Sequence, residues 1–169
     1  WFPVSALELI FDLESDRMQH LDFAPAIIER ERGVIQSERR SSVDNDNFGM
    51  LNEQMQATAF LAHPYQIPVI GWPADIAAWS RDDLMKYFRT YYAPNNATFI
   101  VVGDVSPAAI FALAEKYLGS IPAQTPPPPV RTTEPEQQGE RRMLLTKAAQ
   151  VPLLQEAYHV GNEGDADNP

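Results

Sequence analysis

The sequence contains no cysteine among its 169 residues. Disulfide frameworks, thiolate nucleophiles and cysteine-ligated zinc or iron–sulfur sites are therefore excluded. The sequence also lacks an apolar run of the roughly 20 residues needed to span a bilayer, and its N-terminus lacks the basic and then hydrophobic segments of a signal peptide. Because an absence of cysteine is tolerated in every compartment, localisation stays open at this point.

Positive charge is scarce as well. The 13 Lys and Arg residues are outnumbered by 23 Asp and Glu residues, which gives a formal net charge of −10 and a pI near 4.6. Such an acidic chain is repelled by phosphate backbones, which disfavours nucleic acid and anionic membranes as partners. The hydrophobic fraction of 44% is enough for the core of one domain or for parts of two.

Apolar residues recur at helical spacing in the first part of the chain. One amphipathic stretch covers 6–18. A second covers 25–40, and Pro25 suits the first turn of a helix. The segment 41–47 is rich in turn-forming residues, so we expect a break there before a helical stripe resumes at Leu51.

Two further helices are predicted by their caps. Ser80 followed by Asp83 is typical of a helix start, and Pro94 ends the apolar face that follows. Ser106–Pro107 opens the last helix, and Gly119 closes it.

The segment Phe99–Val102 is short, rich in β-branched residues and bounded by turn-forming residues, which predicts a buried strand. Two more strand candidates cover 142–147 and 153–160. Because a strand that leads directly into a helix is typical of α/β and α+β domains, we expect helices packed on a sheet.

A change of composition divides the chain between Pro122 and Gly139, where four consecutive prolines occupy 126–129. Such a segment favours polyproline II geometry and acts as a semi-rigid spacer. The tail 161–169 is acidic and loop-like.

Two glutamates interrupt the apolar stripe of the second helix. Glu31 has isoleucine or valine three and four residues away on both sides, and Glu38 has the same neighbours on its N-terminal side. Neither acid has a cation three or four residues away. Burying an unpaired carboxylate costs several kcal/mol, so we expect a group outside the helix to satisfy each one.

A metal ion, a histidine or a distant arginine would serve that purpose. Seven residues of helix rise by about 10.5 Å, which is too far for both carboxylates to bind one ion. The spacing suits one metal ligand and a second carboxylate that orients a metal-bound histidine. Two alternatives stay open here: arginines of neighbouring helices pair with both acids, or the helix is exposed and both are ordinary surface charges.

The acid pair belongs to a longer pattern. The segments 7–18 and 31–40 are followed in order by Ala62–Tyr65 and by further blocks at 92–97, 101–104 and 117–122. This succession covers nearly the whole chain. It resembles the pitrilysin/insulinase family of zinc metallopeptidases, and most closely the bacterial members related to the mitochondrial processing peptidase.

The resemblance implies roles for both acids. In that family two histidines of an inverted H-x-x-E-H motif and a glutamate on a later helix hold zinc, and the glutamate of the motif activates water. By this match Glu38 is the third zinc ligand, and Glu31 supports the histidine shell that surrounds the metal. No substrate-binding residue is assigned.

The sequence departs from the family in lacking H-x-x-E-H. Its three histidines, His20, His63 and His159, have no ligand spacing. The family places the motif upstream of the third ligand, so we expect this chain to be a fragment without two zinc ligands and the general base, and to be inactive by itself. The alternative is a catalytically silent parent that acts as a peptide-binding or assembly subunit.

The resemblance thus implies that the intact protein is a zinc metalloendopeptidase acting on unfolded or flexible polypeptides. We expect an α+β, two-layer domain with helices on a mixed, mostly antiparallel sheet. Residues 1–121 would form the later part of the zinc-site domain, 122–140 a linker and 141–169 the opening strands of the next domain. The implied partners are a polypeptide substrate and the rest of the protein or a homologous subunit, and the relatives suggest an exported or periplasmic bacterial location.

Overall fold

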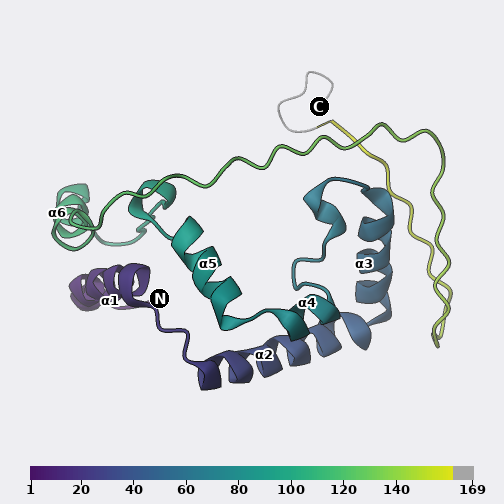
Figure 1. The fold of residues 1–169 in the computed structure, drawn as a ribbon, viewed down its shortest axis with the longest axis horizontal. Coiled ribbons are helices and arrows are strands. Elements are labelled where there is room, and N and C mark those ends of the chain that lie inside the picture. The colour runs from purple at the N-terminus through teal and green to yellow at the C-terminus, as the bar shows by residue number, and fades with distance from the viewer. Residues whose placement is uncertain (162–169) are drawn as a thin grey trace. The chain divides into compact units, whose positions relative to one another are not determined.

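The computed structural model describes residues 1–161. In this range six α-helices are joined by short 3-10 turns and one π-helical segment (Figure 1). The α-helices are α1 (Leu7–His20), α2 (Pro25–Arg39), α3 (Asn47–Ala59), α4 (Pro73–Ala78), α5 (Arg81–Tyr91) and α6 (Pro107–Leu118). The short segments are η1 (Val4–Ala6), the π-helical η2 (Arg40–Asp44), η3 (Pro64–Gln66) and η4 (Pro94–Asn96). None of the helices in this described range is long and apolar enough to cross a membrane.

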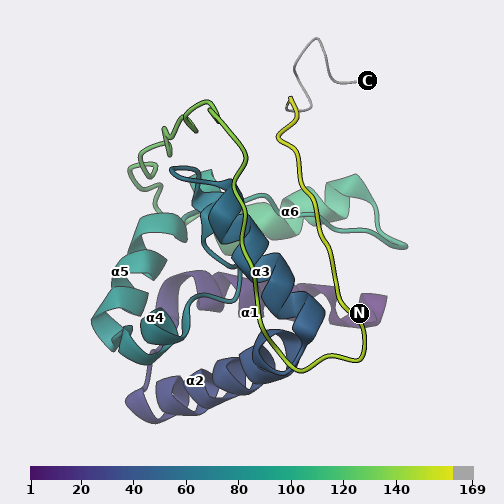
Figure 2. The same cartoon turned by 90° about the vertical axis from the view of Figure 1, so that its right-hand side faces the viewer.

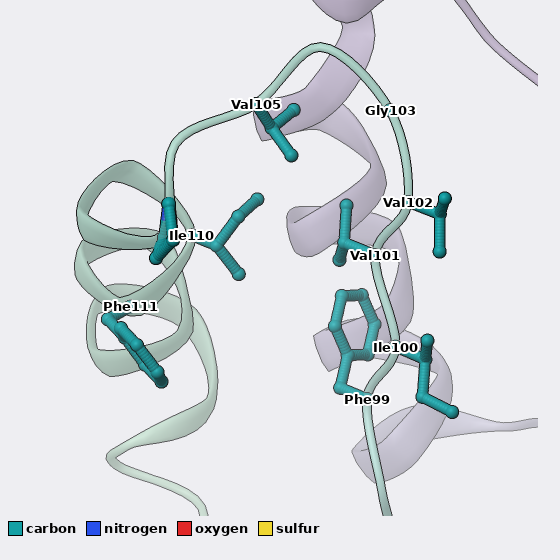
Figure 3. Close-up of a pocket in the computed structure, with 9 residues that line it drawn as sticks. Phe99, Ile100, Val101, Val102, Gly103, Val105, Ile110 and Phe111 are labelled. Atoms are coloured by element: carbon teal, nitrogen blue, oxygen red, sulfur yellow. The ribbon is translucent and has the colours of Figure 1, made fainter.

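The predicted α+β fold is wrong, because residues 1–161 contain no β-strand. The three predicted strands, 99–102, 142–147 and 153–160, are irregular, and Ile100 and Val102 are 79% and 92% exposed. The segment Phe99–Val102 is nevertheless extended, with Phe99 and Val101 pointing toward α6 and Ile100 and Val102 pointing away (Figure 3). Alternation reports an extended backbone, whereas a strand also needs a partner for its N–H and C=O groups.

The predicted helices are confirmed. Pro25 opens α2, and Ser80 and Asp83 form a reciprocal capping box at α5. The Ser106 hydroxyl accepts a hydrogen bond from the Ala109 N–H at 3.3 Å at the start of α6. These signals succeed because a cap involves only residues within one turn. The short helix α4 was not predicted.

The chain divides into two compact units, and the boundary falls inside α2. The first comprises 1–29 and 79–129. Its core contains Phe11, which is fully buried and lies 4.8 Å, ring centroid to ring centroid, from Phe99. In this unit α1 packs against α6, and Glu8 of α1 accepts a hydrogen bond from Lys116 at 2.6 Å.

The second unit comprises residues 30–78 and the described residues from 130 onward. Here α3 packs against η2 and η3. The residues buried in this unit include two apolar side chains, Val43 and Ile76, and one pair of opposite charges, Arg39 and Glu53.

The segment 130–161, which we call the strap, runs in extended form beside α3 (Figures 1 and 2). Glu134 and Arg141 attach the strap near the C-terminal end of α3, and Lys147 attaches it to the Asp44 carbonyl. Asn47, at the start of α3, donates a hydrogen bond to the Ala148 carbonyl. The division predicted at 122–140 stays a prediction, and the predicted acidic tail beyond residue 161 lies outside the described residues.

Candidate functional site

The acid pair lies on α2. A seven-residue separation is nearly two helical turns, so Glu31 and Glu38 project from the same side of the helix. Both are exposed, and Val34 between them is 55% exposed. The expectation that both acids are buried is therefore wrong for the described residues, although Ile28 of the same stripe is only 7% exposed. In its last turn α2 buries Arg39 instead, a charged residue that hydrophobic periodicity assigns to the surface.

The two acids differ in their surroundings. The Glu31 carboxylate pairs with Arg30 of the same helix at 3.1 Å, and both side chains are more than half exposed. Such a pair contributes at most about 1 kcal/mol. The Glu38 carboxylate has no hydrogen bond or ion pair with any described residue. Water satisfies it at the surface, so the group outside the helix that burial would have required is not needed here.

A zinc site needs about three protein ligands. Among residues 1–161 no group of three or more His, Cys, Asp or Glu side chains is placed to hold a metal ion. Glu38 offers a carboxylate oxygen, a donor that zinc accepts, and this oxygen is committed to nothing else in the described chain. The chemistry of Glu38 thus fits one position of a zinc site, and the other ligands must come from outside the described residues.

The three histidines are engaged elsewhere. His20 ends α1 and contacts Asp16 at 2.9 Å. His63 caps η3 by accepting a hydrogen bond from the Tyr65 N–H at 3.3 Å. The ring of His159 stacks on Phe60 with a centroid distance of 5.0 Å. Each of the three histidines thus makes a polar, capping or packing contact with a neighbouring side chain or backbone group.

Arg39 and Glu53 are two charged residues to which the sequence pattern assigned no role. Arg39 Nη1 donates to Glu53 Oε2 at 2.6 Å, and Nη2 donates to Oε1 at 2.9 Å. Nη1 also donates to the Gly71 carbonyl at 3.0 Å, and Nε lies 3.5 Å from Asp44 Oδ1. The hydrogen bond to Glu53 raises the pKa of Arg39 despite the opposing effect of burial. No local signal marks this pair, because its members lie 14 residues apart on different helices.

The main chain directly after Arg39 is held as well. The hydroxyls of Ser41 and Ser42 each donate to the Glu38 carbonyl at 2.9 Å. The π-helical turn η2 closes with a hydrogen bond from the Asn45 N–H to the Arg40 carbonyl at 2.9 Å. A π-helical turn is rare and often stands at a functional site.

Another carboxylate in this unit, that of Glu134, is bound by backbone groups. It accepts hydrogen bonds from three successive N–H groups, those of Leu61 at 2.7 Å and of Ala62 and His63 at 2.8 Å. Burial raises the pKa of Glu134, but these hydrogen bonds and the charge of Arg141 outweigh that effect and lower it to about 2. The proline content of this segment predicted a spacer and gave no sign of this contact.

The first unit contains an apolar hollow of about 560 Å³ between Phe99–Val102 and the start of α6 (Figure 3). The residues that line it carry no titratable side chain, so the hollow offers no acid, base or metal ligand. They are Phe99, Ile100, Val101, Val102, Gly103, Val105, Pro107, Ile110 and Phe111.

Comparison with known families gives one match. Residues 78–169 match the family described as the Peptidase M16 inactive domain. This range does not include the part of α2 that carries Glu31 and Glu38.

Two curated relatives are zinc or processing peptidases by name. The zinc protease PqqE of Helicobacter pylori is 34% identical over 144 residues, which are 83% of this chain and 32% of that protein. The mitochondrial-processing peptidase subunit beta of Lentinula edodes is 31% identical over 116 residues, 69% of this chain and 25% of that protein. The chain thus spans about a third or less of the relatives that it matches.

Two solved structures share the fold. The crystal structure of a protease from Helicobacter pylori has a TM-score of 0.77 and 34% identity, over 82% of this chain and 34% of that one. The periplasmic protease PqqL from Escherichia coli has a TM-score of 0.69 and 23% identity, over 79% of this chain and 15% of that one.

Proposed function

Because this chain belongs to the peptidase M16 family, we propose that it is part of a zinc metalloendopeptidase and that Glu38 supplies the third zinc ligand. One observation supports this assignment above the others. Glu38 is an exposed carboxylate without a partner among the described residues, yet it stands on a helical turn whose neighbouring side chains are fixed by hydrogen bonds.

The chain's own residues would contribute as follows. Glu38 places one carboxylate oxygen toward the metal, and Glu31, two turns earlier on the same side of α2, accepts a hydrogen bond from a histidine ligand and holds its ring in orientation. When bound, zinc supplies an activated water and polarises the carbonyl of the scissile peptide bond. The histidine ligands and the general base belong to the part of the protein outside this chain, so the 169-residue chain alone is inactive and binds zinc weakly.

The substrate, partners and location follow from the same proposal. The intact protein acts on unfolded or flexible polypeptides, and its other subsites come from the remaining domains or from a homologous subunit. A periplasmic or otherwise exported bacterial location fits the periplasmic protease PqqL, which shares the fold.

The test replaces Glu38 by Gln in the full-length protein. Zinc content and peptide hydrolysis are expected to fall to background, because an amide oxygen is a poor zinc ligand. Glu136→Gln, the same change at another exposed position, is the control and keeps both. Glu31→Gln is expected to weaken zinc binding about 10-fold to 100-fold. Zinc retained at full occupancy in Glu38→Gln would contradict the proposed ligand.

A second candidate is favoured by the description of the matched domain as inactive. In that case the intact protein is a catalytically silent member that holds a peptide or a partner chain. Wild-type full-length protein that binds flexible peptides but contains no zinc and hydrolyses none of them would establish this function instead.

A further inference from the structure

The end of α2 is held from two sides. On one side the Arg39 side chain, only 6% exposed, is buried against Glu53 of α3 and the Gly71 carbonyl. On the other side the hydroxyls of Ser41 and Ser42 hold the Glu38 carbonyl. Between these attachments the Glu38 carboxylate projects into solvent.

The bidentate geometry restricts how this turn can rotate. Two parallel hydrogen bonds fix the plane of the Arg39 guanidinium relative to the Glu53 carboxylate, which a single hydrogen bond would not do. Successive side chains on an α-helix are separated by about 100° around the axis. Fixing the direction of Arg39 therefore also fixes the direction in which Glu38 leaves the helix.

Stability alone does not account for this arrangement. A buried ion pair is often no more stabilising than apolar side chains of similar volume, because both charges lose their hydration. Its advantage over an apolar contact is directional, and direction is what a metal ligand needs, since zinc requires its donors within a few tenths of an ångström of their positions.

We propose that Glu53 is a positioning residue for Glu38. Through Arg39, it sets the orientation of the last turn of α2 and so the position of the zinc-binding carboxylate. The inference rests on the proposed zinc function of Glu38, and it adds a role for two residues that do not touch the metal.

The test uses the full-length protein and separates orientation from stability. In Arg39→Met/Glu53→Leu, apolar side chains replace the ion pair, so the fold is expected to keep its thermal midpoint while losing the bidentate contact. Zinc affinity, measured by competition with a chelator, is expected to fall about 10-fold or more. Glu53→Asp keeps the charge on a shorter side chain and is expected to recover part of that loss. Glu134→Gln removes a carboxylate from the same unit far along the sequence and is expected to keep zinc affinity within about twofold of the wild type.

A second readout needs no metal. In the metal-free protein the amide hydrogens of 38–45 are expected to exchange faster in the double variant than in the wild type, whereas those of α6 are unchanged. If the double variant binds zinc as tightly as the wild type, or if Glu134→Gln weakens zinc binding equally, the positioning role is overturned. Failure of the parent proposal looks different, because Glu38→Gln itself would then retain zinc.

Discussion

The ends of α2 and α3 are both secured by a charged side chain, but in opposite ways. At the end of α2 the cation Arg39 meets the carboxylate of Glu53, and both side chains are 6% exposed. At the end of α3 the half-buried carboxylate of Glu134 accepts hydrogen bonds from three backbone N–H groups, and no cation among residues 1–161 lies within hydrogen-bond distance of it.

The two arrangements respond differently when a charged side chain is lost. A buried ion pair leaves a very costly orphan when one partner is removed, because the remaining charge has neither water nor a counter-ion. A carboxylate near the surface leaves only backbone N–H groups, which water can reach. The end of α2 is therefore intolerant of single substitutions. The end of α3 tolerates them better, and its stability depends on pH through Glu134.

Removing one charge of the buried pair should have the largest effect on the free energy of unfolding. Glu53→Gln removes the carboxylate that binds both Nη atoms of Arg39 and leaves only Asp44, 3.5 Å from Nε, as a counter-ion. We expect the free energy of unfolding to fall by up to about 3–5 kcal/mol in urea denaturation of the chain. Arg39→Met/Glu53→Leu removes both charges and should restore most of this loss. A single variant as stable as the wild type would show that the pair is hydrated rather than buried.

A substitution at the contact between η2 and α3 should have the next largest effect on the free energy of unfolding. A Cβ added at Gly49 would collide with the Ser42 carbonyl, a backbone atom that cannot move aside. We expect Gly49→Ala to lower the free energy of unfolding by about 1–3 kcal/mol, as overpacking does. Gly33→Ala is the matched control, because nothing lies within 4 Å of its added Cβ. That change should raise helix stability by about 0.5–1 kcal/mol, and equal effects of the two changes would contradict the close approach at Gly49.

The smallest effect should come from Glu134, and it should depend on pH. Its pKa is lowered from 4.5 to about 2 in the folded chain. The unfolded state therefore takes up a proton first, so the stabilising contribution of Glu134 is complete above about pH 4.5 and disappears as the pH falls toward 2. In Glu134→Gln, the thermal midpoint should fall less steeply than in the wild type between pH 5 and pH 3. Parallel pH profiles of the two proteins would show that the three N–H groups do not hold this carboxylate in solution.

Local signals in the sequence predicted the helices well. Ser80 with Asp83, and Ser106 with Pro107, act within a single turn, so no distant contact is needed to identify them. Strand pairing is not local. The β-branched residues of Phe99–Val102 therefore suggested a strand for which residues 1–161 provide no partner.

The distinction between local signals and distant contacts also applies to the candidate site. Glu31 and Glu38 were found because they interrupt a periodic pattern, although the pattern's implied burial was wrong. Arg39 and Glu53 were missed because each looks like an ordinary surface charge in its own helix. Glu134 was missed because the prolines around it suggested a spacer, and only the folded chain shows which backbone groups it meets.

The contacts of Arg39, Glu134 and Lys147 close loops of different length, which affects the order in which they form. Arg39 and Glu53 close a loop of 14 residues, whereas Glu134 closes loops of 71 to 73 and Lys147 one of 103. Closing a loop five times longer costs about 1–2 kcal/mol more in chain entropy, so we expect the contact between Arg39 and Glu53 to form before the strap is added. On unfolding we expect the reverse, with the strap detaching while the turn that carries Glu38 is still intact.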